Sequence, residues 1–298
     1  MFKRLLVPLD GSRLAESALP AAAYLAQNLA IPVTLVHVLE HNAPAEIHGE
    51  HHLTDKDEAY TYLNEVALRA FPSEVDVERH VHTSEVSDVA ASIERHVVEL
   101  NSDLIVMCTH GRSGVHNFLF GSIAQQVIAL GKTPVLLIQP SISDQNKIFS
   151  CRRILIPLDG NPEHEQALPL VAELAQACSS SIHLVMVVPT LGTLSGEKAA
   201  TARLLPGATS ALLDLTQEGA EKYLQQHISE LRNQEIGVTA EVARGDPITA
   251  IVRTQTEMNV DLIALGTHGK TGTDAFWSGS LTPKIASRTN IPLLLVPV

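Results

Sequence analysis

The sequence has little of three things that would assign it to common classes of protein. Its three cysteines, Cys108, Cys151 and Cys178, are an odd number without framework spacing, which suits a reducing compartment. Only 21 basic residues stand against 33 acidic ones, a net charge of −12, which disfavours general binding to nucleic acid or anionic membranes. No uncharged apolar run approaches 18 residues, and no apolar signal segment follows Met1. We therefore expect no membrane span and, by elimination, a cytoplasmic location.

What the sequence does contain is a long internal repeat. Residues 4–12 (RLLVPLDGS) return as residues 153–161 (RILIPLDGN), an offset of 149. Residues 134–138 (PVLLI) return as residues 292–296 (PLLLV), an offset of 158. The second copy has therefore gained nine residues in its middle.

Copies of this length are two domains rather than short solenoid units. We place the first domain at residues 1–140 and the second at residues 151–298. Residues 141–150 lie in a polar stretch and form the predicted linker.

Within the first copy, short apolar strands alternate with helical patterns. We expect strands at 5–7, 32–39, 75–81, 104–107 and 134–138, and helices at 12–30, 60–69, 88–100 and 122–130. Strands that are apolar on both faces predict a mainly parallel sheet of about five strands with helices on both sides. The expected fold is thus α/β, two tandem doubly wound domains. Ligands of such sheets bind at the carboxyl ends of strands, where Asp10 and Asp159 follow the first strand of each copy.

A glycine-rich segment follows the fourth strand of each copy. It is GTHGKTGTDAFWSGS at residues 266–280 and CTHGRSGVHNFLFGS at residues 108–122. Glycines at the end of a strand leave backbone N–H groups bare, so that a phosphate can approach them. Ser280 opens the next helix, whose free amides and dipole favour an anion. The pattern predicts a duplicated nucleotide-binding module.

These residues resemble the universal stress protein family in its tandem two-domain form. The family's ATP motif is Gly, two residues, Gly, nine residues, then Gly and Ser or Thr. The second copy matches it with Gly266, Gly269, Gly279 and Ser280, whereas the first copy has Cys108 in place of the first glycine.

The resemblance implies an adenine nucleotide alpha hydrolase-like fold and a stress-response protein that binds ATP, ADP or AMP, chiefly in the second domain. It implies a sensor or regulator rather than an enzyme, with Mg²⁺ as a possible companion of the nucleotide. The implied second-domain contacts are Pro157, Asp159, Val187, Gly266, Thr267, His268, Gly269, Gly279, Ser280 and Thr282. The implied first-domain contacts, less secure because Cys108 adds a Cβ, are Asp10, Val38, Gly111, Gly121 and Ser122.

Other interpretations stay open. The glycine segments could be turns, and Asp10 and Asp159 could cap the following helices. Family members pair through their last strands, so residues 134–138 and 292–296 could form that pair within one chain, with a homodimer also open. The protein would then be a nucleotide-independent adaptor. Weak ATP hydrolysis is a further alternative.

Two enzyme classes fit less well. A P-loop needs glycine where Ala264 stands, and the pyrophosphate loop of ATP pyrophosphatases is missing after the first strand. A metal site is a separate alternative, because His41, His48, His51 and His52 lie in one segment.

Overall fold

The computed structural model describes residues 2–41, 43, 46–47, 50–109, 121–140, 148–162, 164–194, 196–267 and 281–297. These residues fall into two compact units. The first takes in the described part of 1–150 together with Thr267 and residues 290–297, and the second takes in the described part of 151–266 and residues 281–289. Because the last strand of the chain belongs to the first unit, the units do not coincide with the two copies of the repeat. The domain boundaries at 140 and 151 stay a prediction.

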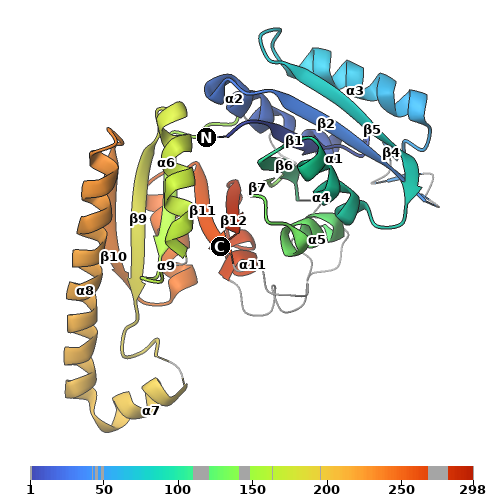
Figure 1. The fold of residues 1–298 in the computed structure, drawn as a ribbon. Coiled ribbons are helices and arrows are strands. Elements are labelled where there is room, and N and C mark those ends of the chain that lie inside the picture. The colour runs from blue at the N-terminus through green and yellow to red at the C-terminus, as the bar shows by residue number, and fades with distance from the viewer. Residues whose placement is uncertain are drawn as a thin grey trace. The chain divides into compact units, whose positions relative to one another are not determined.

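The first unit is a doubly wound α/β sheet (Figure 1). Its strands β5, β2, β1, β6 and β7 follow one another in space in that order, and all run parallel. The strands are β1 (Leu5–Pro8), β2 (Val33–Glu40), β5 (Val77–Val86), β6 (Leu104–Cys108) and β7 (Val135–Ile138), with a small antiparallel ladder of β3 (Glu46–Ile47) and β4 (Glu50–His51). The predicted parallel sheet of five strands is confirmed for this copy.

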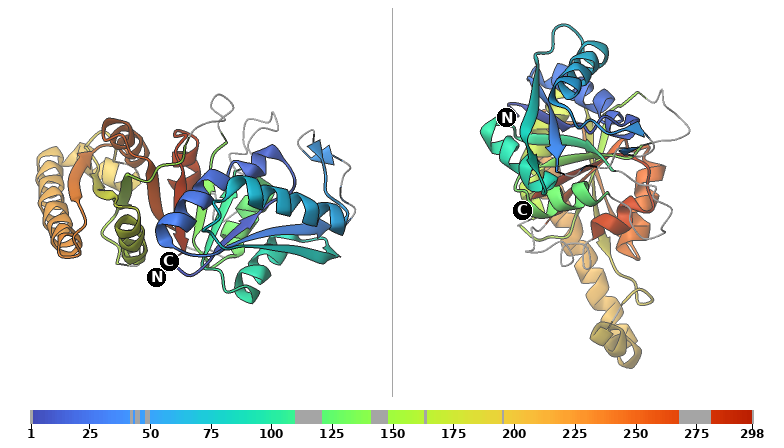
Figure 2. Two further views of the ribbon diagram at one scale, coloured as in Figure 1. Left: turned by 90° about the horizontal axis from the view of Figure 1, so that it is seen from above. Right: turned by 90° about the vertical axis from the view of Figure 1, so that its right-hand side faces the viewer.

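Helices cover both faces of this sheet, α2 and α3 on one and α4 and α5 on the other (Figures 1 and 2). They are α1 (Arg13–Glu16), α2 (Leu19–Leu29), α3 (Lys56–Ala70), α4 (Val89–Glu99) and α5 (Ser122–Leu130). Asp55 and Asp88 cap α3 and α4 by accepting backbone amides of the first turn. The helix expected over 12–30 is two helices, because Pro20 occupies the first turn of α2 and the chain breaks just before it.

The first unit also contains the last strand of the chain, β12 (Leu293–Pro297). It runs antiparallel to β7, and Leu293, Leu294 and Leu295 stand opposite Leu137, Leu136 and Val135. All of these side chains are buried. The pairing continues the first sheet beyond β7.

The second unit repeats the doubly wound order. Its strands β10, β9, β8 and β11 follow in that order and run parallel. The strands are β8 (Arg153–Leu158), β9 (Ser181–Val188), β10 (Val238–Arg244) and β11 (Leu262–Thr267). The helical segments are η1 (His164–Gln166), α6 (Ala167–Ala177), α7 (Gly196–Leu204), α8 (Pro206–Arg232), α9 (Pro247–Glu257) and α11 (Leu281–Ala286).

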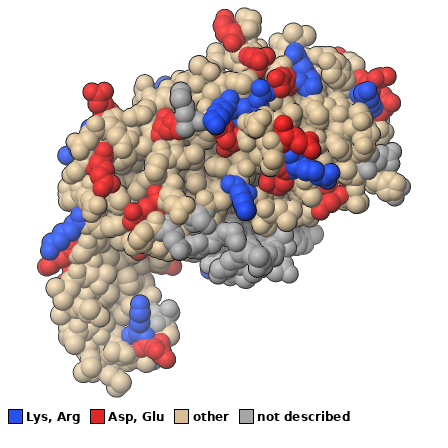
Figure 3. All heavy atoms as spheres, viewed as in Figure 1, with Lys and Arg blue, Asp and Glu red and all other residues tan. Residues whose placement is uncertain are grey.

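The two copies differ most between their second and third strands. The first copy places the β3–β4 ladder and the 15-residue helix α3 there, whereas the second places α7 and the 27-residue helix α8. Arg244 on β10 anchors α8 by donating to Gln217 and Asp214, both at 2.7 Å. Leu204, Leu212 and Leu215 are exposed on α7 and the start of α8, a region with few charged side chains in Figure 3. Within the described residues, no helix combines the length and apolarity that a bilayer crossing requires.

Candidate functional site

In each unit the order of the parallel strands reverses at one place. In the first unit the chain passes from β1 to β2 on one side and later adds β6 on the other, so the strand order reverses between β1 and β6. The same reversal falls between β8 and β11 in the second unit. Doubly wound sheets bind ligands at the carboxyl ends of strands at such a switch point. Asp10 and Asp159, the predicted contacts, directly follow β1 and β8.

In the first unit Asp10 builds the turn between β1 and α1. Its Oδ1 accepts the backbone amide of Ser12 at 2.9 Å and the Ser12 hydroxyl at 2.7 Å. The same hydroxyl accepts the amide of Ala15 at 3.2 Å, so Ser12 caps α1. The cap of α1 is therefore Ser12 and not Asp10, which acts behind it as the acceptor of an Asx turn.

A second segment covers this turn. Gly11 has φ +92°, and a Cβ added there would lie 2.9 Å from Leu53 Cγ. The buried His37 ring joins the two segments, with Nδ1 2.7 Å from the carbonyl oxygen of Leu9 and Nε2 3.0 Å from that of Leu53. Glu50 accepts the amide of Arg13 at 2.6 Å, so a carboxylate already occupies the start of α1. Residues 50–53 therefore pack onto the Asp10 turn.

Cys108 ends β6 on the other side of the same turn. Its thiol is buried, at 2% exposure. Burial, opposed by a hydrogen bond with Ser17 and assisted by the Asp10 charge, raises the pKa of Cys108 to about 12. Cys108 thus fills with an inert thiol the position where the nucleotide motif has glycine.

The corresponding turn of the second unit is more open. Asp159 Oδ1 accepts the amide of Asn161 at 3.0 Å, and Oδ2 lies 2.8 Å from His164 Nδ1. The Asp159 side chain is 58% exposed. Gly160 has φ +78°, and among the described atoms outside the turn only Met186 Cε, at 3.7 Å, would meet an added Cβ. No counterpart of Leu53 is found in the described part of this unit.

In each unit a half-buried tyrosine lies near the glutamate that follows the aspartate turn. Tyr223 on α8 donates to Glu165 at 2.7 Å. Burial raises the pKa of Tyr223, with the Glu165 hydrogen bond and the charges of Glu165 and Asp159 adding to the effect. In the first unit burial, together with Glu16, likewise raises the pKa of Tyr62. Glu16 and Glu165 are repeat equivalents, but the buried Tyr62 hydroxyl has no hydrogen-bond partner among the described residues, so only Tyr223 makes this contact.

The structure places the remaining predicted residues on the elements that border these turns. Pro157 lies on β8 opposite Val185 of β9, and Val187 lies on β9 opposite Ala243 of β10. In the first unit, Val38 lies on β2 opposite His82 of β5. Gly266 is near the end of β11, the buried Thr267 donates its hydroxyl to the carbonyl of Val296 at 3.3 Å, and Thr282 is buried in α11. Gly121 is the residue before α5, and Ser122 is its exposed first residue.

Several predicted contacts fall outside the described residues. They are Gly111 in the first copy and His268, Gly269, Gly279 and Ser280 in the second. The part of the phosphate-binding prediction that depends on these residues stays a prediction.

Leu53, His164 and Tyr223 have roles at these turns that the sequence alone does not predict. Leu53 reaches Gly11 across more than forty residues, and no local pattern indicates that contact. His164 was visible as a histidine five residues after Asp159, a spacing that lets a short helix fold it back. In the histidine-rich segment 41–52, His51 lies 3.0 Å from Glu58, and His48 is outside the described residues.

Fold and site together define a duplicated, doubly wound α/β protein with an aspartate turn at the switch point of each sheet. The model of the universal stress protein family matches residues 1–139 and again residues 150–297. The chain therefore belongs to the universal stress protein family and is a tandem two-domain member of it.

Known relatives match one copy or the whole chain. Universal stress protein Sll1654 of Synechocystis is 34% identical over 143 residues, 46% of this chain and 86% of its own. MJ0531 of Methanocaldococcus jannaschii is 30% identical over 148 residues, 49% of this chain and 81% of its own. A universal stress protein structure from Archaeoglobus fulgidus covers 99% of this chain and 96% of its own with a TM-score of 0.59 at 18% identity, which shows a shared fold.

Another solved universal stress protein is described as a complex with cAMP. It covers 47% of this chain at 22% identity with a TM-score of 0.36. The bound cAMP is a property of that protein.

The thiols should be unreactive in the folded protein. Cys108, Cys151 and Cys178 are free and buried. The contact with Cys178, together with burial, raises the pKa of the Cys151 thiol, and burial raises the pKa of the Cys108 thiol. We expect Ellman's reagent at pH 8 to modify none of them within minutes, and all three after unfolding in guanidinium chloride. Rapid modification of a single thiol in the native protein would contradict the described burial.

Adding a methyl group at the two turns should have unequal effects. Gly160→Ala carries the strain of its positive φ, about 1 kcal/mol, whereas Gly11→Ala must also displace Leu53 and should cost about 2 kcal/mol or more. Urea unfolding followed by circular dichroism measures both. Because the two positions are in contact, the double variant Gly11→Ala/Leu53→Ala should lose less stability than the sum of the losses in the two single variants. An equal or larger loss for Gly160→Ala would refute the covered first turn.

Proposed function

We propose that the protein binds an adenine nucleotide in the pocket of its second unit and uses the bound state as a signal. Family membership supports a nucleotide ligand of the kind that the ATP motif implies. The observation that carries the choice of pocket is the contrast between the two turns: Leu53 packs tightly on Gly11, whereas among the described atoms a Cβ at Gly160 would meet only Met186 Cε, at an ordinary contact distance of 3.7 Å.

The second pocket fits a nucleotide by its donors and by its space. Gly266 brings a backbone without a side chain near the end of β11, so that a phosphate could approach its main chain closely. Asp159 presents an exposed carboxylate at the switch point, suited to the hydroxyl groups of a ribose. Pro157 and Val187 lie on the two strands beside it. The glycine pattern of residues 266–280 continues this cradle in sequence.

The first pocket fits the same ligand less well. Glu50 holds the amide of Arg13 at 2.6 Å, and Cys108 replaces the glycine at the end of β6. A phosphate there would meet acidic side chains in place of bare amides. We therefore expect one nucleotide per chain.

A signalling role suits the second pocket better than catalysis. His164 and the Asn161 amide hold Asp159, and Tyr223 holds Glu165. Both carboxylates are engaged by the protein and are not arranged as a pair of Mg²⁺ ligands. The protein would then act in the cytoplasm, where its free thiols are expected to stay reduced.

A second function is favoured by one separate observation. β12 pairs antiparallel with β7 through three residue pairs whose side chains are all buried. We infer that the tandem repeat supplies within one chain the strand pairing that single-domain family members are expected to make between chains. An adaptor role, independent of nucleotide, would use this paired arrangement.

Nucleotide binding should depend on Asp159 far more than on Asp10. Thermal unfolding and isothermal titration calorimetry with ATP, ADP, AMP and cAMP measure it. Loss of a charged acceptor at the ligand, about 1.5–3 kcal/mol, predicts a roughly 10- to 100-fold weaker Kd for Asp159→Ala. Asp10→Ala should keep the wild-type Kd, and the stoichiometry should be one.

Each other outcome has a definite meaning. If Asp10→Ala abolishes binding and Asp159→Ala does not, the working pocket is the first one. If no adenine nucleotide binds the wild-type protein, the adaptor role replaces the sensor role. If the wild-type protein converts ATP to ADP and Asp159→Ala does not, the protein is an ATPase.

The strand pairing predicts the size of the particle. With β7 already paired, the chain should be a monomer of about 32 kDa by multi-angle light scattering at micromolar concentration. A stable particle of twice that mass, unchanged on dilution, would show that pairing within the chain does not replace assembly between chains.

A further inference from the structure

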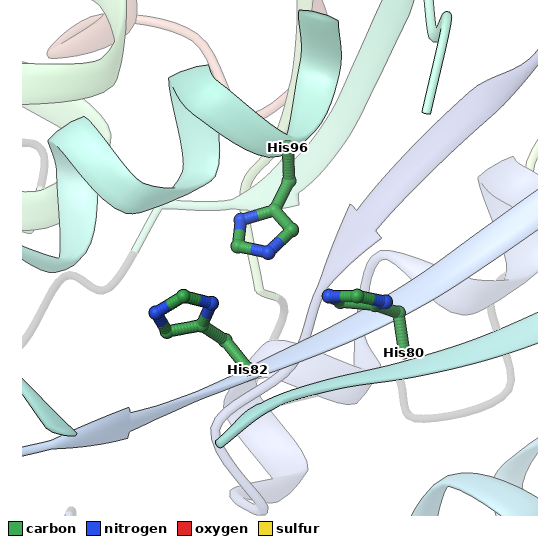
Figure 4. Close-up of side chains that lie close together, drawn as sticks. All are labelled: His80, His82 and His96. Atoms are coloured by element: carbon green, nitrogen blue, oxygen red, sulfur yellow. The ribbon is translucent and has the colours of Figure 1, made fainter. Parts of the chain in front are cut away.

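Three histidines of the first unit converge at a place the nucleotide proposal does not use. His80 and His82 lie on β5, and His96 lies on α4 (Figure 4). One ring nitrogen of each lies within 4.8 Å of the others. The His96 ring centroid is 4.6 Å from that of His80 and 4.9 Å from that of His82.

The local structure accounts for this convergence. Residues two apart on a strand share a face, so β5 presents both imidazoles to the same side of the sheet. Their partners in the β2–β5 pair are the buried Val36 and Val38. Ile93, His96 and Val97 are the buried face of α4 at helical spacing. Packing that face on the sheet carries His96 to the two strand histidines.

A hydrogen bond fixes the tautomer of His96. Its Nδ1 lies 2.6 Å from the carbonyl oxygen of Ser92. A carbonyl oxygen only accepts, so Nδ1 carries the proton and donates it. Nε2 is then left with its lone pair when the ring is neutral. Histidines that bind metals show this arrangement, in which the second nitrogen donates to a carbonyl or carboxylate.

We propose that His80, His82 and His96 form a binding site for a divalent transition-metal ion, with Zn²⁺ the best fit. Three neutral imidazoles are a donor set that zinc accepts in tetrahedral geometry. Bonds of 2.0–2.1 Å place tetrahedral ligands about 3.3 Å apart, so small ring rotations suffice. Glu99 Oε2, 4.0 Å from His96 Nε2, or a water molecule completes the coordination.

The surrounding charges suit a neutral histidine cluster. Burial first, then the neighbouring imidazoles, lower the pKa of His80, and burial, His96 and Arg95 lower that of His82, with Glu99 opposing in both. Besides the imidazoles themselves, Arg95 and Glu99 of α4 are the charged groups that act on His80 or His82. Bound metal would join α4 to β5, which ends the row of strands in this unit.

The experiment is a metal titration of the full chain without an affinity tag. Protein freed of metal with EDTA and then dialysed is titrated with ZnCl₂ at pH 7.5 by calorimetry. We expect one Zn²⁺ per chain, and a Kd at least tenfold weaker in His82→Ala and in His80→Ala. CoCl₂ should give the visible d–d absorption of tetrahedral cobalt, and both variants should lose it.

The control removes a histidine of the same unit from the other histidine-rich segment. His51→Ala deletes an exposed imidazole paired with Glu58 and should leave Kd and the cobalt spectrum unchanged. Circular dichroism of each apo variant separates loss of a ligand from loss of the fold. The partly exposed His80 and His82 are safer positions for substitution than His96, which is buried and also packs α4.

Thermal unfolding gives an independent readout. Zinc at 100 times its Kd should raise the Tm of the wild-type protein by about 5–10 °C and that of His82→Ala by much less. Absence of saturable zinc binding, or binding that survives His80→Ala and His82→Ala unchanged, would overturn the proposal. Binding that only His51→Ala removes would place the metal in the other segment.

Discussion

The turn that follows the first strand of each unit depends on one aspartate carboxylate oxygen. It accepts the amide two residues later, at 2.9 Å in the first unit and 3.0 Å in the second. The intervening glycine, Gly11 or Gly160, takes the positive φ that lets the chain leave the strand. Because the neighbouring strands run parallel, their carboxyl ends surround this turn. A pocket at this place follows from strand order, and its content depends on what the rest of the chain lays over the turn.

One segment decides that content. After β2 the first copy returns through the β3–β4 ladder, and Leu53 and Glu50 close on the turn. After β9 the second copy instead uses its nine extra residues for α7 and a longer α8, which Arg244 fastens to β10. A single length change between equivalent strands thus accounts for a covered turn in one unit and an exposed Asp159 in the other. Cys108, the substitution that the sequence shows most plainly, acts in the same direction.

The sequence predicts the elements well because their signals are local. The buried strand β6, the helix α5 over its predicted residues 122–130 and the cap at Ser12 follow from patterns a few residues long. The contacts that separate the two pockets are not local, since Leu53 meets Gly11 only when the sheet has formed. The histidine cluster lies between these cases. His80 and His82 show their spacing in the sequence, but which face of α4 carries His96 to them is decided by how Ile93 and Val97 pack.

The two proposed ligands divide between the units for a physical reason. Packing on the Asp10 turn leaves the first unit with little room for a polyphosphate, whereas the buried His96 of α4 and the partly exposed His80 and His82 of β5 would gain from a partner that offsets their desolvation. A metal ion supplies such a partner without needing an open crevice, because imidazole nitrogens reach it from inside the fold. The second unit keeps an open turn, and a ligand bound there would stabilise it. Because a ligand that binds only the folded unit stabilises that unit, duplication with unequal covering would let one chain respond both to a metal and to a nucleotide.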